Sequence, residues 1–215
     1  MANILGYMFF SSLEYLAFIL LVFSVFTFRP ERYMLIITLL TILTTILSYF
    51  MTITDLYKII PIPIIVAPIL AFVLNRIFHD KYTYCLVATI GGLVIYGLIQ
   101  GIVIKLANSV NLPIDINDPY GLTTYFIQSI CAVIGISVSV YTCFTHSGFG
   151  FSFYRLSNRR FVLLSVCMLL ICSIAYVTSV NVHSSTTFMT AICAMIIGTL
   201  IIMFLSYQQD QIEFS

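Results

Sequence analysis

The residues best suited to covalent chemistry are His79 and Cys85, which lie six positions apart in the stretch RIFHDKYTYC. A histidine beside a cysteine can hold the thiol as a reactive thiolate. On one continuous helix, a separation of six residues turns the second side chain about 120° away from the face of the first. That geometry is poor for a catalytic pair. We therefore interpret His79 as a loop residue at a membrane edge.

Other catalytic signatures do not occur in the sequence. It contains no G-x-S-x-G, no H-E-x-x-H and no glycine-rich phosphate loop. The six cysteines lie in or beside apolar runs, without a C-x-x-C pair and without histidines at the spacing of metal ligands. We expect them to be packing residues. The predictions are that the protein is not an enzyme and uses no metal or other cofactor.

Three polar side chains interrupt long apolar runs, and Tyr96 stands near one of them. These three side chains are Glu14, Gln100 and Gln128. An ionisable side chain at membrane depth costs about 2.5–3.5 kcal/mol even on a mild insertion scale. Interactions with other groups must therefore offset the cost of placing Glu14 in the membrane. Tyr96 is four residues before Gln100 and therefore shares its helix face. These four residues are candidate ligand-binding residues.

A second candidate site is the acidic segment NSVNLPIDINDP, which contains Asp115 and Asp118. An acidic loop outside the membrane is a natural first contact for an extracellular ligand. A connector rich in Pro and Asn between two helices would have the same composition. Both interpretations stay open for Asp115 and Asp118.

The composition indicates a protein built for lipid. Of 215 residues, 61% are hydrophobic and 8% are charged, and the mean hydropathy is +1.10. A soluble domain carries about 25% charged residues, so soluble classes are set aside. The net charge of +1 provides no basic field for nucleic acid, which is not expected as a partner.

The elements that would carry these residues are transmembrane helices of about 20 residues each. Seven apolar runs predict an all-α, polytopic membrane domain over residues 1–207, followed by a short cytoplasmic tail at 208–215. The runs are 4–28, 33–54, 59–78, 83–107, 120–144, 161–180 and 185–207. The loops after the first, third and fifth runs hold seven of the nine Lys and Arg residues. This asymmetry predicts an outer amino terminus and a cytoplasmic carboxyl terminus.

In this topology the three polar residues lie at a similar depth in the membrane. Glu14, Gln100 and Gln128 lie roughly 15, 10 and 12 Å below the outer ends of their helices at 1.5 Å per residue. They could satisfy one another by hydrogen bonds between helices, with Glu14 protonated, or they could line a cavity or ion path open to the outside. The sequence leaves both interpretations open.

Small residues at positions 131, 135 and 139, Cys, Gly and Ser, form a stripe on the fifth run. Such stripes let helix backbones approach closely. The contact can lie within one chain or between two copies, and the sequence does not choose between them. In the third run, Pro61, Pro63 and Pro68 favour a kink or an irregular helix start.

Three segments carry a family resemblance: SSLEYLAF in the first run, GGLVIYGLIQG in the fourth, and the polar, amphipathic carboxyl end FLSYQQDQIEFS. With its several-helix layout, the chain resembles the membrane sensor region of peptide-responsive, quorum-sensing histidine kinases of the accessory gene regulator type. In that family the last helix leads into a dimerisation helix with a phosphoacceptor histidine. Here no histidine follows His183 and there is no glycine-rich ATP site, so we expect no kinase activity from this chain alone.

The resemblance implies a receptor-like sensor module of the cell membrane without its own kinase domain. The partners it implies are the lipid bilayer, an extracellular peptide or small-molecule ligand, a cytoplasmic kinase or other membrane subunit, and a second copy of the chain. One alternative is the membrane subunit of a small-molecule transporter. A further alternative is a membrane cysteine peptidase that processes propeptides, but the glycine-rich context before its histidine is replaced here by NRIF.

Overall fold

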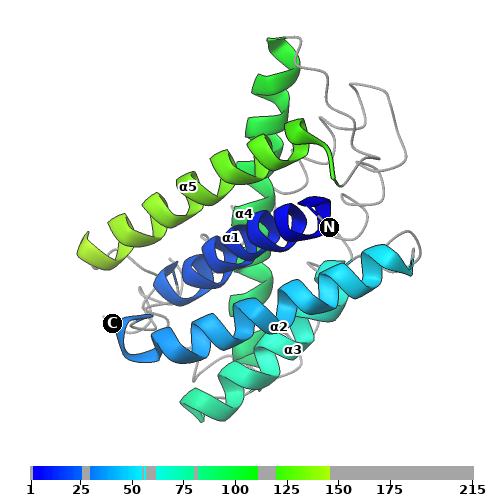
Figure 1. Ribbon diagram of the computed structural model, residues 1–215. Helices are drawn as coiled ribbons and strands as arrows, with labels where there is room; N and C mark the ends of the chain where they lie inside the picture. Colours follow the sequence, from blue (N-terminus) through cyan, green and yellow to red (C-terminus); the bar gives the residue numbers. More distant parts are fainter. Residues whose placement is uncertain are drawn as a thin grey trace. The chain divides into compact units, whose positions relative to one another are not determined.

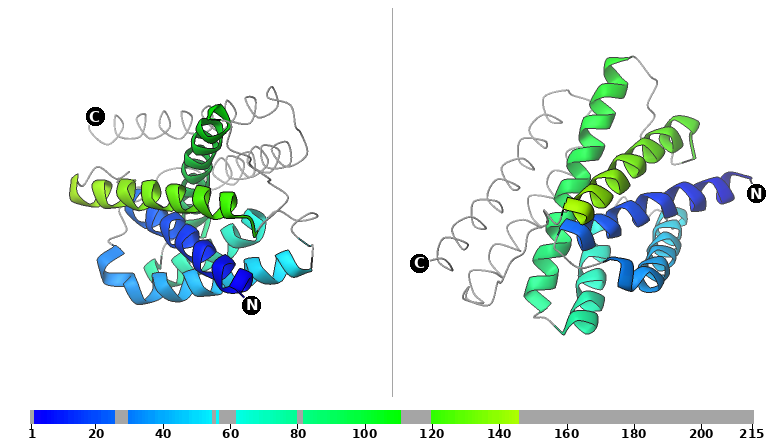
Figure 2. Two further views of the ribbon diagram at one scale, coloured as in Figure 1. Left: turned by 45° about the horizontal axis from the view of Figure 1, so that its top comes forward. Right: turned by 90° about the vertical axis from the view of Figure 1, so that its left-hand side faces the viewer.

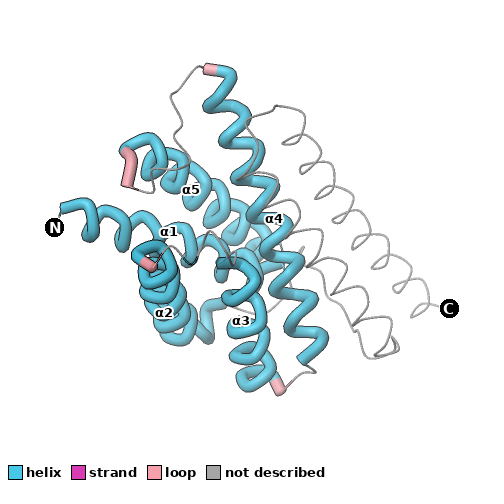
Figure 3. Tube along the Cα trace, turned by 90° about the vertical axis from the view of Figure 1, so that its right-hand side faces the viewer, coloured by secondary structure: helices cyan, strands magenta, loops and turns pink. Residues whose placement is uncertain are grey.

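The computed structural model of the chain describes residues 2–25, 30–54, 56, 62–79, 82–110 and 120–145. Within these ranges every regular element is a helix, as the tube in Figure 3 shows. The elements are α1 (Ala2–Val25), the 3-10 turn η1 (Pro30–Tyr33), α2 (Met34–Ile53), α3 (Ile62–Phe78), α4 (Tyr82–Ser109) and α5 (Leu122–Thr145). The prediction of an all-α protein is confirmed for this part of the chain.

Four of the described helices are long and apolar enough to cross a membrane. Their candidate spans are Ile4–Ser24, Met34–Ile53, Cys85–Ala107 and Leu122–Thr145. The apolar part of α3, Ile65–Phe78, is shorter than a full span. The predicted runs 161–180 and 185–207 and the tail 208–215 lie outside the described residues. These helices indicate a membrane protein, while the count of seven spans and the orientation stay predictions.

Helix α2 buries mostly polar residues and exposes apolar ones, which is the reverse of the pattern in a soluble protein. Its buried residues are mostly small and polar: Ile37, Leu40, Thr41, Thr44, Thr45, Ser48 and Met51. Its exposed residues are large and apolar, and include Leu35, Leu39, Ile42, Leu43, Ile46 and Phe50. The buried threonines donate to carbonyls of their own helix, as Thr41 Oγ1 does to Ile37 O at 2.8 Å. Lipid is the solvent that suits such an outer face.

The contacts divide the chain into two compact units. The first contains residues 1–62 and 96–148, and therefore α1, α2, α5 and the second half of α4. Within this unit α1 lies between α2 and α5 and contacts both. The dark blue α1 can be followed between the cyan-blue α2 and the yellow-green α5 in Figures 1 and 2.

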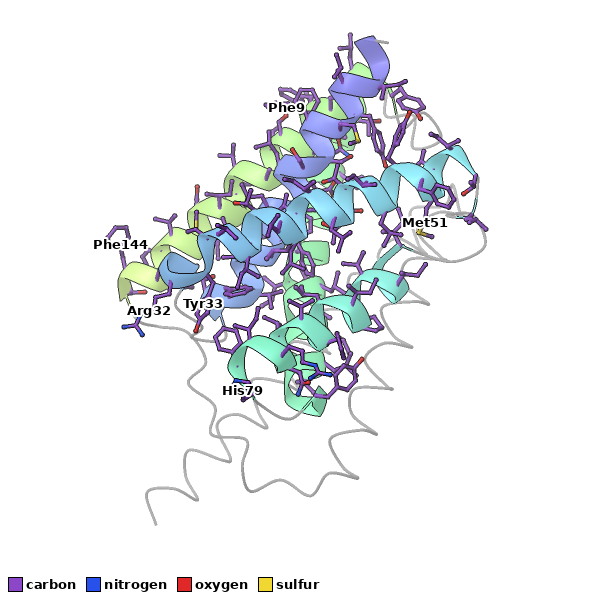
Figure 4. The ribbon with its side chains drawn as sticks, turned by 60° about the horizontal axis from the view of Figure 1, so that its bottom comes forward. Phe9, Arg32, Tyr33, Met51, His79 and Phe144 are labelled. Atoms are coloured by element: carbon purple, nitrogen blue, oxygen red, sulfur yellow. The ribbon has the colours of Figure 1, made fainter. Side chains whose placement is uncertain are left out.

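The carboxyl-terminal third of α1 is a buried core segment of the first unit. Seven residues between positions 17 and 24 are buried hydrophobic or small polar side chains: Ala17, Phe18, Ile19, Leu21, Val22, Phe23 and Ser24. A helix that is apolar on all sides is one that other helices surround. Phe9 of α1 and Phe144 of α5, labelled in Figure 4, lie on the outside and are 59% and 83% exposed.

In the second unit, α3 buries one face and ends in a polar turn. Its buried residues are Val66, Ala67, Leu70, Ala71 and Leu74. Pro68 lies inside this helix. The guanidinium carbon of Arg76 lies 5.2 Å from the ring centre of Phe72, one turn earlier. His79 follows with a φ of 54°, the left-handed conformation that commonly ends a helix, and Figure 4 shows it at that end.

Candidate functional site

The polar layer consists of Glu14, Gln100 and Gln128, with Tyr96 beside them. Glu14 extends from α1 and its Oε1 accepts a hydrogen bond from Nε2 of Gln100 on α4. The side chain of Gln128 on α5 makes a second hydrogen bond to Glu14. Three helices therefore meet at one carboxyl group. The similar depths worked out from the sequence anticipated this meeting, whereas a role of these residues in ligand binding stays a prediction.

Two buried polar atoms of this layer have no hydrogen-bond partner among the described residues. They are Oε1 of Gln128 and the hydroxyl oxygen of Tyr96. Because Oε1 of Gln128 is unpartnered, its amide NH₂ is the group that donates to Glu14. A buried polar atom without a partner costs about 1–3 kcal/mol. The layer thus has hydrogen-bonding capacity that the fold itself does not use.

Tyr96 is held in place from its ring side. Its ring centre lies 6.3 Å from that of Phe18 on α1, with the planes inclined by 60°. Only 5% of the residue is exposed, and it interacts electrostatically with Glu14. Aromatic packing therefore fixes the ring, while its hydroxyl lies within the electrostatic reach of the carboxyl group.

The small residues of α5 make this convergence possible. A Cβ atom on Gly135 would lie 3.2 Å from Cβ of Ala17 and 3.4 Å from the ring carbon Cε2 of Tyr96. One turn further, Ser139 Oγ donates to the Leu20 carbonyl of α1 at 3.0 Å. The stripe of small residues on α5 therefore serves a contact within this chain.

A second set of polar contacts joins α1 and α2 near the start of α1. The hydroxyl of Tyr7 lies 2.9 Å from Ser48 Oγ and 3.0 Å from Thr52 Oγ1. The Tyr7 ring also packs against Tyr49, with their centres 5.7 Å apart. Sequence reasoning did not select these residues. Their signal was the spacing of Ser48 and Thr52, which are four positions apart and so lie on one face of α2.

The remaining candidates lie elsewhere. Asp115 and Asp118 fall outside the described residues. Cys85 is fully buried, whereas His79 is exposed just after α3. A reactive cysteine needs access to its substrate, so this arrangement offers no support to a thiol catalyst. Among the described residues no group of three His, Cys, Asp or Glu side chains could hold a metal ion.

Comparison with known proteins finds no matching protein family, no matching curated protein and no matching solved structure.

Proposed function

We propose that the protein is a multi-pass sensor module of the cell membrane, in which the polar layer binds a ligand and a separate cytoplasmic kinase receives the signal. One observation carries this proposal: a carboxyl group held by amides from two other helices, with a hydroxyl and an amide oxygen left unpartnered beside it. A fully satisfied network rigidifies a core, whereas this network leaves two buried atoms without a partner among the described residues. An unsatisfied network is suited to an additional partner.

The layer also suits the transmission of a signal. Glu14, Gln100 and Gln128 belong to α1, α4 and α5, so a ligand that engages all three changes the contacts between three helices. If the amino terminus lies outside, as the distribution of Lys and Arg predicts, the layer belongs to the outer half of the membrane. The resemblance to quorum-sensing receptors supports an extracellular signal and an exit through the predicted last run, 185–207.

The proposal assigns no catalytic role to the protein. The rival function is that of a transporter subunit, in which the same layer would be a substrate pocket. Both functions need a ligand at the layer, and they differ in the protein that works with this chain. The partner is therefore the property that separates them.

The test is capture of the tagged full chain from native membranes in mild detergent, followed by identification of the proteins that copurify. Membranes without the tagged chain provide the background. Recovery of a histidine kinase or response regulator supports the sensor, and kinase phosphorylation should then differ between the wild type and Glu14→Gln. Recovery of a transport ATPase would overturn the sensor function in favour of transport.

A further inference from the structure

The hydrogen-bonding capacity that the polar layer leaves unused is mainly that of acceptors, beside the O–H donor of Tyr96. The Glu14 carboxylate has about four lone-pair sites, of which the amides of Gln100 and Gln128 take two. The amide oxygen of Gln128 can only accept, and the hydroxyl oxygen of Tyr96 can accept as well. The layer therefore offers three acceptors from three helices.

Within the described part of the chain, no positively charged side chain bonds to the carboxyl group of the layer. Both hydrogen bonds to Glu14 come from neutral amides. A buried carboxylate is normally paired with a cation, because neutral donors alone do not compensate its charge. A ligand that brings a cation together with hydrogen-bond donors would supply both missing features.

We propose that the polar layer binds a primary ammonium group through Glu14, the Gln128 amide oxygen and the Tyr96 hydroxyl. An ammonium group has three N–H donors and no acceptor, which matches these three acceptors one to one. The inference rests on the proposed ligand-binding function and adds the chemical class of the ligand. Glu14, Gln100 and Gln128 are half-buried as whole residues, whereas the unpartnered oxygens of Gln128 and Tyr96 are buried, so binding requires side chains of the layer to move.

The ammonium group could come from a soluble amine or from the head group of an ethanolamine lipid, and the experiment separates these sources. The full chain is reconstituted into nanodiscs of phosphatidylcholine, whose quaternary ammonium has no N–H donor. Ethylammonium chloride is the probe. Sodium chloride and tetramethylammonium chloride, at equal ionic strength, control for charge without N–H donors. The readout is the midpoint of thermal unfolding, followed by circular dichroism.

The expected result is a saturable rise in the midpoint with ethylammonium alone, of about 3–6 °C at ten times the dissociation constant. Glu14→Gln should abolish the rise. Tyr96→Phe keeps the ring that packs on Phe18 and should weaken apparent affinity about five- to tenfold. Tyr141→Phe, on the exposed part of α5, is the matched control and should bind as the wild type does.

Several results would overturn the proposal. They are an equal response to sodium or tetramethylammonium, no saturable response at all, or a full response in Glu14→Gln. If Glu14→Gln does not fold, Tyr96→Phe decides, because unchanged affinity in that variant removes the layer as the site. In nanodiscs that contain phosphatidylethanolamine, a raised midpoint that ethylammonium no longer changes identifies a lipid source, and a persisting response identifies a soluble amine.

This outcome and that of the partner capture are independent. Recovery of a kinase without an ammonium response would reject the ligand class and leave the sensor function standing. An ammonium response with recovery of a transport ATPase would support the ligand class and reject the sensor function.

Discussion

Adding a methyl group at Gly135 should press α5 against α1. The new Cβ would lie 3.2 Å from Cβ of Ala17 and 3.4 Å from both Leu21 Cδ1 and Tyr96 Cε2. The contact with Ala17 is tight enough that this neighbour must give by a few tenths of an ångström, whereas the two contacts at 3.4 Å are at the limit of ordinary van der Waals contact. Overpacking costs about 1–3 kcal/mol, and alanine returns up to about 1 kcal/mol of helix propensity. We expect Gly135→Ala to lose about 0–2 kcal/mol and Gly135→Val to lose about 3 kcal/mol.

The assay is unfolding by a denaturing detergent in mixed micelles, with helicity as the readout. Val133→Ile adds volume to the same helix at a position that is 65% exposed, and should leave stability unchanged. Ala17→Gly removes the nearest opposing atom and should recover part of the loss in the Gly135→Ala background. Wild-type stability of Gly135→Val, or an additive loss in the double variant, would refute the close contact between α1 and α5.

Three further changes test other parts of the structure. Tyr7→Phe removes the hydroxyl that contacts α2 and should cost about 0.6 kcal/mol in the same unfolding assay, whereas Tyr141→Phe, at an exposed position, should cost nothing; equal effects would contradict the Tyr7 contact. Leu43→Lys places a charge at the centre of the exposed apolar face of α2 and should weaken membrane insertion by about 2.5–3.5 kcal/mol, measured in an insertion assay; full tolerance would argue that this face does not meet lipid. In a variant whose only cysteine is Cys85, a maleimide should react with the denatured chain and hardly with the folded one, because this side chain is fully buried; rapid labelling of the folded protein would restore the thiol as a candidate catalyst.

Much of the polar layer could be predicted because depth along a helix follows from residue count alone. Glu14, Gln100 and Gln128 are rare polar residues in long apolar runs, and the rise of 1.5 Å per residue places them at similar levels. The sequence could not tell whether they satisfy one another, because that depends on side-chain rotamers. The unpartnered hydroxyl of Tyr96 became visible only with the packing against Phe18.

Helix boundaries were predicted within about three residues where a run is uniformly apolar, as for α2 and α5. The stretch between the first two runs was expected to be a loop, but Pro30–Tyr33 forms a 3-10 turn directly before α2. Proline tolerates such a first turn because it needs no N–H partner. The third run was expected to span from residue 59. The described helix covers Ile62–Phe78, and residues 57–61 lie outside the described residues.

Helix partners were harder to predict than helices. A stripe of small residues predicts that another helix packs closely against it, but does not identify that helix. Only the structure identifies Ala17 and Leu20 of α1 as the groups that meet Gly135 and Ser139. The buried threonines of α2 escaped notice for a similar reason, since Thr is unremarkable in an apolar run until its face is known.

A double-mutant cycle between Glu14 and Gln100 tests the central claim, that a buried polar layer joins helices, at the contact between α1 and α4. The stabilities of Glu14→Ala, Gln100→Ala and the double variant are compared with the wild type in the mixed-micelle assay. Glu14→Ala combined with Ser137→Ala, at an exposed position of α5, is the control pair and should be additive. We predict a coupling of about 0.6–1.7 kcal/mol between Glu14 and Gln100. Additive losses for Glu14 and Gln100 would contradict the account.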